Sequence, residues 1–158
     1  MTQVPVLASA WHKSQQWLAE IADELGWTDT QHAYVALRAT LHALRDRLTV
    51  DEAADLAAQL PLVVRGIYFE GWNPSSTPVR IRDLDTFLLP VRRALAWDFV
   101  PDPERVARAV FAVLSRHVSS GEIEDVLGSL PAEIRGLFPG EVVEAWSERY
   151  AESTAGVP

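Results

Sequence analysis

The side chains that most often perform catalysis or bind metals are sparse in this sequence and form no recognised motif. The four histidines include no pair spaced four residues apart, and neither an H-E-x-x-H nor an E-x-x-H sequence occurs. The segment most similar to a metal motif is Asp29-x-x-His32, and a di-metal site in a helical bundle requires such a motif from two helices. We therefore expect no metal site and assign these two residues to surface or capping positions.

Patterns for nucleophiles and phosphate binding are also absent. The sequence contains no cysteine and a single lysine, Lys13, and it has neither a G-x-S-x-G elbow nor a glycine-rich phosphate loop. We therefore expect no cofactor and no catalytic residues. One enzymatic alternative stays open, an activity of unrecognised type that would use Asp46, Asp51 or His42 beside the turn at residues 45–47.

Four arginines are candidates for ligand binding because they form two pairs separated by 70 residues, Arg38 with Arg108 and Arg65 with Arg135. Arg65 and Arg135 each precede a glycine, as expected for an arginine that binds the last carbonyls of a helix next to a left-handed turn. Two other roles stay open. The arginines could bind an anionic ligand or an acidic partner near a pseudo-twofold axis, or pair with the carboxylates of their own half, which are Glu52, Asp55, Glu122 and Asp125.

Two aromatic residues near a loop rich in Gly, Pro and Ser are candidates for contact with a partner. Trp72 lies between Gly71 and Pro74, where we expect it to be partly exposed, and Tyr68 precedes it in the same segment. Exposed tryptophan is enriched in interfaces, but Trp72 could equally cover the core between the two halves of the chain.

These residues would be positioned by helices that form an internal repeat. A shift of 70 residues without gaps aligns many identical residues, among them Leu18 with Leu88, Trp27 with Trp97, and Leu60 with Leu130. The two copies span about residues 17–69 and 87–138, and residues 70–82 form the linker between them.

Signals for helix starts recur in both copies. Residues 49–52 form a capping box, residues 119–122 repeat it, and Asp102 precedes a proline suited to a first helical turn. The apolar stripe of the first helix is Trp11, Leu18, Ile21 and Leu25. The sequence therefore predicts an all-α fold, a tandem duplication of a four-helix unit packed as one pseudo-symmetric domain, with an additional C-terminal helix over residues 141–152.

The length of 158 residues predicts one helical domain over residues 1–152, followed by a disordered tail over residues 153–158. The formal net charge of −8 argues against binding to nucleic acid. No apolar run reaches the roughly 20 residues that a membrane span requires, and the start of the chain shows no secretion signal. We therefore expect a cytoplasmic protein, and the preference for arginine over lysine suggests a bacterial origin.

The segment at residues 41–72 carries a resemblance to a known family. It contains Ala-Gln-Leu-Pro at residues 58–61, followed by Arg65-Gly66 and by Gly71-Trp72. Together with residues 109–115, these motifs resemble the bacterial domain-of-unknown-function family 2267, and the resemblance covers about residues 11–145. It implies a small all-helical bacterial protein and supplies no activity or catalytic residues.

Three functional hypotheses follow. The first is a non-enzymatic helical interaction module that binds a protein partner or self-associates, because no catalytic arrangement is present while a helical bundle offers grooves. The second is a small-molecule binder with an apolar crevice between the two copies, where Arg65 or Arg135 meets an anionic head group. The third is the enzyme of unrecognised type.

Overall fold

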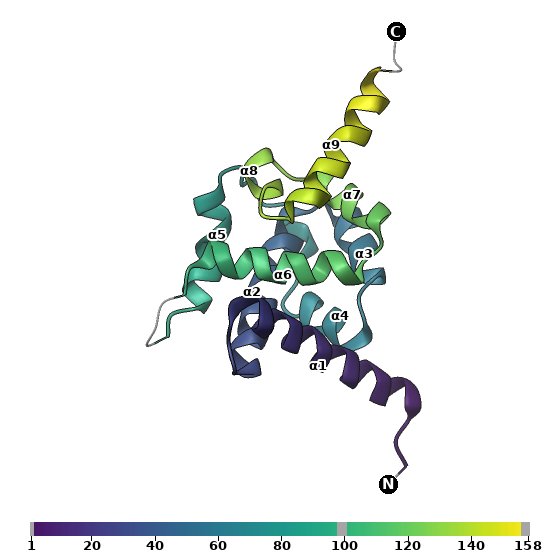
Figure 1. The fold of residues 1–158 in the computed structure, drawn as a ribbon, viewed down its shortest axis with the longest axis vertical. Coiled ribbons are helices and arrows are strands. Elements are labelled where there is room, and N and C mark those ends of the chain that lie inside the picture. Colours follow the sequence, from purple (N-terminus) through teal and green to yellow (C-terminus); the bar gives the residue numbers. More distant parts are fainter. Residues whose placement is uncertain (1, 98–100, 156–158) are drawn as a thin grey trace.

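The chain folds into helices throughout the part that the structure describes. The structure is a computed structural model that describes the backbone of residues 2–97 and 101–155, with side chains as far as residue 151. Within these residues there are nine α-helices, one 3₁₀-helix and no strand (Figure 1), which confirms the predicted all-α class. The elements are α1 (Pro5–Leu25), α2 (Thr30–Arg47), α3 (Val50–Ala58), α4 (Leu62–Phe69), η1 (Pro74–Ser76), α5 (Leu84–Ala94), α6 (Pro103–His117), α7 (Ser120–Gly128), α8 (Ala132–Arg135) and α9 (Gly140–Ala155).

Side-chain caps begin several of these helices where the sequence predicts them. The carboxylates of Asp29 and Asp102 accept backbone N–H groups at the starts of α2 and α6. The hydroxyls of Thr49 and Ser119 do the same for α3 and α7. The reciprocal half of the first capping box is not formed, because no hydrogen bond joins the Thr49 N–H to the Glu52 carboxylate among the described residues.

The two terminal helices are longer than the sequence pattern predicts. α1 begins at Pro5, since a proline is well suited to a first helical turn, and Trp11 is 58% exposed although its spacing places it in the buried stripe. α9 continues to Ala155 and so includes residues 153–155, which the pattern predicts as disordered tail, while residues 156–158 lie outside the described residues. The outer ends of both helices project from the body of the molecule (Figure 1).

α2 lies at the centre of the fold. It packs against α1, α4, α5 and α6. Four of its buried residues are alanines, and small side chains at a helix contact allow a short distance between helix axes; they are Ala33, Ala36, Ala39 and Ala43. One continuous hydrophobic core contains buried residues of every helix from α1 to α8.

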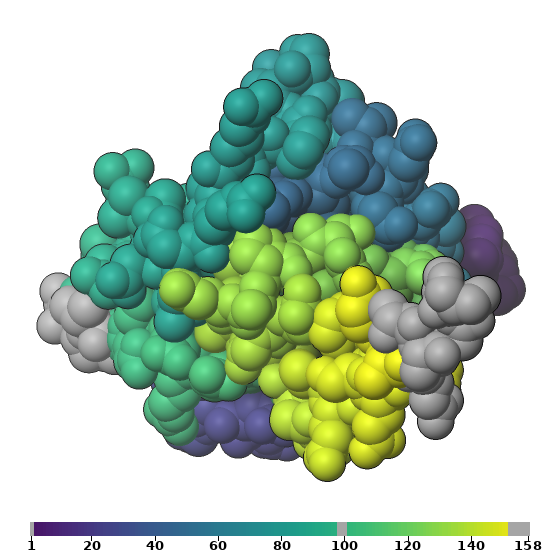
Figure 2. All heavy atoms as spheres, turned by 90° about the horizontal axis from the view of Figure 1, so that it is seen from above, coloured from purple at the N-terminus to yellow at the C-terminus, as the bar shows by residue number. Residues whose placement is uncertain are grey.

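Some helices of the second half begin 70 residues after their counterparts in the first half, and others do not. α3 and α7 begin at Val50 and Ser120, and α4 and α8 begin at Leu62 and Ala132, so both pairs are separated by 70 residues. The counterparts α1 and α5 differ in length, because α1 has 21 residues and α5 has 11. α3 and α7 pack against each other, and Figure 2 shows the green atoms of the second half against the blue atoms of the first.

The predicted linker is held against the end of α2. The Val79 N–H donates to the Asp46 carbonyl at 2.8 Å. The Arg47 Nε donates to the Ile81 carbonyl at 2.6 Å. These two bonds fix the path of the chain between the halves, so residues 70–82 are an anchored loop.

Candidate functional site

Arg65 and Arg135 bind the backbone at the ends of two helices. Arg65 donates from Nε and Nη2 to the carbonyls of Ala57 and Leu60, both at 2.9 Å. Arg135 makes the equivalent bonds 70 residues later in the chain, at 3.1 and 2.8 Å. The last carbonyls of a helix lack donors within that helix. Both guanidinium groups therefore bind carbonyls at the ends of α3 and α7, the helices that precede their own. The left-handed turn expected beside them is not formed, because neither Gly66 nor Gly136 has a positive φ.

The other pair, Arg38 and Arg108, lies on more exposed surfaces. The Nη2 of Arg38 pairs with Glu70 at 2.9 Å. Arg108 pairs with Glu104 at 2.9 Å and donates from Nη1 to the Gly136 carbonyl at 2.7 Å. Among the described residues, none of the four arginines forms the predicted ion pairs with Glu52, Asp55, Glu122 or Asp125.

Of the two aromatic candidates, Tyr68 is a core residue and Trp72 is partly buried against the core. Tyr68 is fully buried, its hydroxyl donates to the Ala53 carbonyl at 2.8 Å, and its burial raises the pKa of the phenol. Trp72 packs against the core with its ring centre 5.2 Å from that of Phe69, and its indole N–H is buried without a hydrogen-bond partner. The structure therefore favours the alternative in which Trp72 covers the core.

The residues of the enzymatic alternative have structural partners or face solvent. The Nε2 of His42 lies 2.7 Å from the Ile67 carbonyl, to which it donates, and burial lowers the pKa of this histidine. Asp46 accepts from the buried Arg45 at 2.9 Å. Asp51 lies exposed in the first turn of α3. Among the described residues, no hydrogen bond or ion pair joins any two of these three groups.

Asp29 and His32 form a local pair at the start of α2. His32 Nδ1 lies 2.9 Å from Asp29 Oδ2, and the other carboxylate oxygen caps the helix. The His32 ring also packs against Trp97, with the ring centres 4.2 Å apart. Among the residues with described side chains, no group of three His, Asp or Glu residues is arranged to hold a metal ion.

Two glutamates from different halves meet where α3 packs against α7. The Oε2 of Glu52 and the Oε1 of Glu122 are both buried without a hydrogen-bond partner. Burial raises the pKa of Glu52, and the nearby charge of Asp125 adds to this effect. Burial, followed by the charge of Glu52, raises the pKa of Glu122 to about 7. The contact therefore favours a protonated Glu122 below that pH.

An uncharged groove lies between α1, α2 and α4, with a volume of about 380 Å³. None of its lining residues is Asp, Glu, Lys or Arg; they are Trp11, Ser14, Gln15, Leu18, Thr30, Gln31, Tyr34, Val63 and Ile67. A second hollow on the outer end of α1 shares Trp11 and is lined by Gln3, Val4, Leu7, Ala8 and His12. The two hollows therefore adjoin at Trp11, and both polar and apolar side chains line them.

Sequence reasoning missed this groove, because its walls come from three helices whose contacts are not visible in the sequence. The spacing of Trp11 fits the buried stripe of α1, but no other described helix covers this residue, which is 58% exposed. One feature of the sequence could have indicated this exposed surface. Val4, Val6 and Leu7 precede the predicted stripe, and no acidic residue occurs before Glu20.

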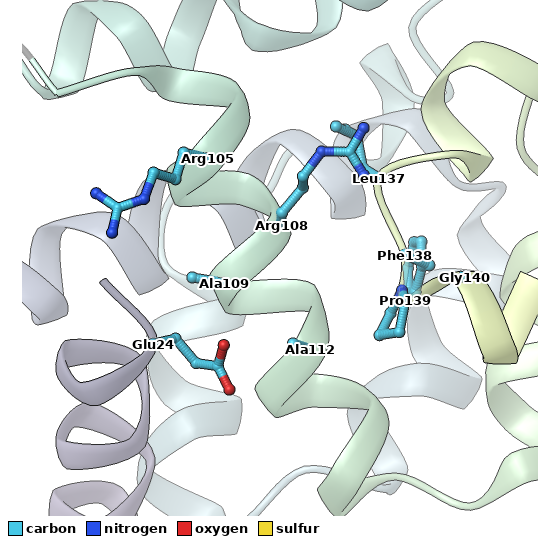
Figure 3. A pocket seen from close by; sticks show the side chains of 9 residues that line it. All are labelled: Glu24, Arg105, Arg108, Ala109, Ala112, Leu137, Phe138, Pro139 and Gly140. Carbon is cyan, nitrogen blue, oxygen red and sulfur yellow. The ribbon is translucent and has the colours of Figure 1, made fainter. Parts of the chain in front are cut away.

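A further hollow, of about 300 Å³, lies between the end of α1, α6 and the start of α9 (Figure 3). Arg105 and Arg108 line it on one side and Glu24 on another. The two guanidinium groups point away from each other (Figure 3), and Arg105 already donates to the Leu25 carbonyl at 3.0 Å. The hollow therefore presents separate cations beside a carboxylate, and not a two-arginine clamp.

The fold and its surface define an all-helical protein with an exposed, uncharged groove and, among the described residues, no cluster arranged to hold a metal ion. None of the described helices combines the length and the hydropathy needed to cross a bilayer. The sequence matches the family described as "Uncharacterized conserved protein (DUF2267)" over residues 14–137, and the chain belongs to this family. The resemblance in the sequence is thereby confirmed. No curated protein matches the chain.

Proposed function

We propose that the protein is a helical interaction module that binds an apolar helix of a protein partner in the groove between α1, α2 and α4. The observation that carries this proposal is the exposed, uncharged surface around Trp11. Charged residues are depleted and tryptophan and tyrosine are enriched at the centres of protein interfaces. Trp11 and Tyr34 on this surface fit that composition.

The shape of the groove suits a helix. Its walls are helices, and an amphipathic helix commonly binds such a groove through apolar residues spaced three and four apart. Leu18, Val63 and Ile67 supply apolar lining from α1 and α4. Gln15 and Gln31 supply amides that can hydrogen-bond polar groups of the partner.

Photo-crosslinking in cells tests this proposal. A photo-reactive phenylalanine analogue replaces Trp11, and in a matched control it replaces Leu89, which is exposed on α5. We expect cross-links from position 11 to map to one apolar helix and to disappear when Leu7→Glu is added. Equal cross-linking from position 89, or no helix cross-linked from position 11, would contradict the proposal.

A second candidate is the binding of a small anionic molecule in the hollow shown in Figure 3. The observation that favours it is the presence of Arg105 and Arg108 in the lining, whereas Arg65 and Arg135 are used for helix capping. A panel of carboxylates and phosphates should then shift the backbone NMR signals of Ala109, and Arg108→Ala should abolish the shift. Unchanged signals across the panel would dispose of this candidate.

We also propose that the chain is a tandem duplication of a four-helix unit. The equivalent bonds of Arg65 and Arg135, and the equivalent caps of α3 and α7, support it. In equivalent units, the tyrosine hydroxyl of Phe138→Tyr would reach the Ile123 carbonyl, as Tyr68 reaches the carbonyl of Ala53. We expect this variant to lose less than about 1 kcal/mol of unfolding free energy, and a loss of about 3 kcal/mol would contradict equivalence, because it indicates a buried hydroxyl without an acceptor.

A further inference from the structure

We propose that the partner in the groove is a second copy of this chain, and that two copies pair through α1 about a twofold axis. This inference rests on the proposed function, because it assigns an occupant to the same groove. In the pair, the exposed outer turns of α1 from each copy enter the groove between α1, α2 and α4 of the other copy.

The outer turns of α1 lack support within a single copy. The N-cap residue Val4 makes no side-chain hydrogen bond, and the first turn contains no acidic residue to interact with the helix dipole. Val6 is 66% exposed and Leu7 is 54% exposed, on the part of the helix that projects from the body (Figure 1). Short helical segments are marginally stable in water unless an apolar face packs against something. A second copy would supply that packing.

The same surface contains both a projection and a hollow. Leu7 lies on the projecting part of α1, Val63 lies in the adjoining groove, and Trp11 borders both hollows. In a twofold interface, one patch must be complementary to itself, because each contact is made twice with the roles of the copies exchanged. A projecting apolar helix end beside an apolar groove meets this requirement.

Charge also favours pairing through this face. The chain has a formal net charge of −8, so identical copies repel each other at most surfaces. All 22 acidic residues follow residue 19, and Lys13 and His12 are the only titratable side chains before that point. The lining contributed by α2 and α4 is uncharged as well. Two copies can therefore meet here without placing a carboxylate in the lining of either groove.

Sedimentation velocity over a range of protein concentrations tests the pairing. The natural sequence is expected to show a reversible dimer. Leu7→Glu and Trp11→Glu should each weaken it at least tenfold, because each places a carboxylate in an apolar contact. Leu89→Glu, at an exposed position of α5, should leave it unchanged. Circular dichroism of each variant checks that the monomer is folded.

The absence of cysteine in the chain permits a second measurement. One preparation carries Leu7→Cys and another carries Val63→Cys, and the two are mixed and oxidised. We expect a disulfide between the two chains, because the proposed pair brings the outer end of α1 to the groove of the other copy. A mixture of Leu89→Cys with Val63→Cys is the matched control and should remain unlinked.

The outcomes separate this inference from the function on which it rests. A monomer at every concentration, without a link from position 7 to position 63, would overturn pairing through α1. The interaction module would then survive if position 11 still cross-links to a helix of another protein, and would fail if it cross-links to none. Association that persists in both glutamate variants would also overturn the inference, because the copies would then meet through another surface.

Discussion

The guanidinium group of Arg135 lies over the ring of Trp146, with its central carbon 4.1 Å from the ring centre. The same side chain donates two hydrogen bonds to carbonyls at the end of α7. Arg135 therefore joins α7 and α8 to α9. Its counterpart Arg65 makes the same two backbone bonds, and no aromatic ring stacks on it among the described residues.

This difference predicts unequal costs for removing the two arginines. Arg65→Ala should lower the free energy of unfolding by about 1–2 kcal/mol, because the Leu60 carbonyl loses its donor and the Ala57 carbonyl keeps only backbone N–H donors. Arg135→Ala should cost about 1 kcal/mol more, because the cation–π contact with Trp146 is lost as well. Urea denaturation followed by circular dichroism measures both, and Arg92→Ala at an exposed site on α5 is the control. Equal losses at the two positions would contradict a role for Trp146.

The carboxyl pair predicts a pH-dependent stability. The pKa of Glu122 is raised to about 7 in the folded chain, mainly by burial, from an ordinary value of 4.5. The folded state therefore holds a proton that the unfolded state releases. The resulting stability is fully present below pH 4.5 and is lost as the pH rises through about 7.

Glu122→Gln should remove this dependence. The variant should exceed the natural sequence in stability at pH 8 by about 1 kcal/mol, a figure that allows for solvent screening of this partly exposed carboxyl, because its amide stays neutral beside Glu52. Urea denaturation at pH 5, 7 and 8 measures the effect. Glu144→Gln, at an exposed site on α9, is the matched control and should leave the profile unchanged. A Glu122→Gln profile parallel to that of the natural sequence would contradict the buried contact.

The burial of His42 predicts that this residue makes the folded state less stable as the pH falls, which is opposite to the effect of Glu122. Burial lowers its pKa below the ordinary value of 6.5, so the unfolded state binds a proton more readily than the folded state. Stability contributed by the neutral ring is present above pH 6.5 and is lost as the pH falls below it. An NMR titration of the ring should show a midpoint below 6.5, and His42→Gln should lose less stability than the natural sequence between pH 7 and 5. A midpoint above 6.5 would contradict the burial of the ring, because burial lowers the pKa whereas the bond to the Ile67 carbonyl raises it.

Tyr68→Phe should lower the free energy of unfolding by about 1 kcal/mol, because the Ala53 carbonyl loses a buried donor while the packing is kept. Thermal denaturation measures the change. Tyr34→Phe, on the exposed side of α2, is the control and should leave the stability almost unchanged. A loss no larger than that of the control would show that the hydroxyl bond contributes nothing net.

The helices themselves could be predicted because their signals are local. Thr49, Ser119 and Asp102 are recognised from their own neighbours in the sequence, and the structure uses each as a cap. The bonds of Arg65 to helix-end carbonyls were predicted only in part. The expected left-handed turn at Gly66 is absent, because this glycine lies inside α4, and Arg65 binds the end of the preceding helix α3.

The groove and the carboxyl pair could not be predicted, because both depend on contacts between distant segments. Trp11 has the spacing of a core residue, and only the position of α4 and the length of α1 show that it is exposed. Glu52 reads as half of a capping box, and only the packing of α7 on α3 explains why its carboxylate is buried without that bond. Rules based on neighbouring residues in the sequence place these side chains in the correct helices, but they predict the wrong exposure and the wrong contacts for them.

The buried alanines of α2 have a consequence for mutational tolerance. Ala36 has no reactive group and makes no specific bond, yet helices on several sides of α2 are spaced by the small size of such residues. A methionine or leucine there would have to push neighbouring helices apart, and such overpacking costs about 1–3 kcal/mol. These alanines have no reactive side chain, and yet they are positions at which a larger residue is poorly tolerated.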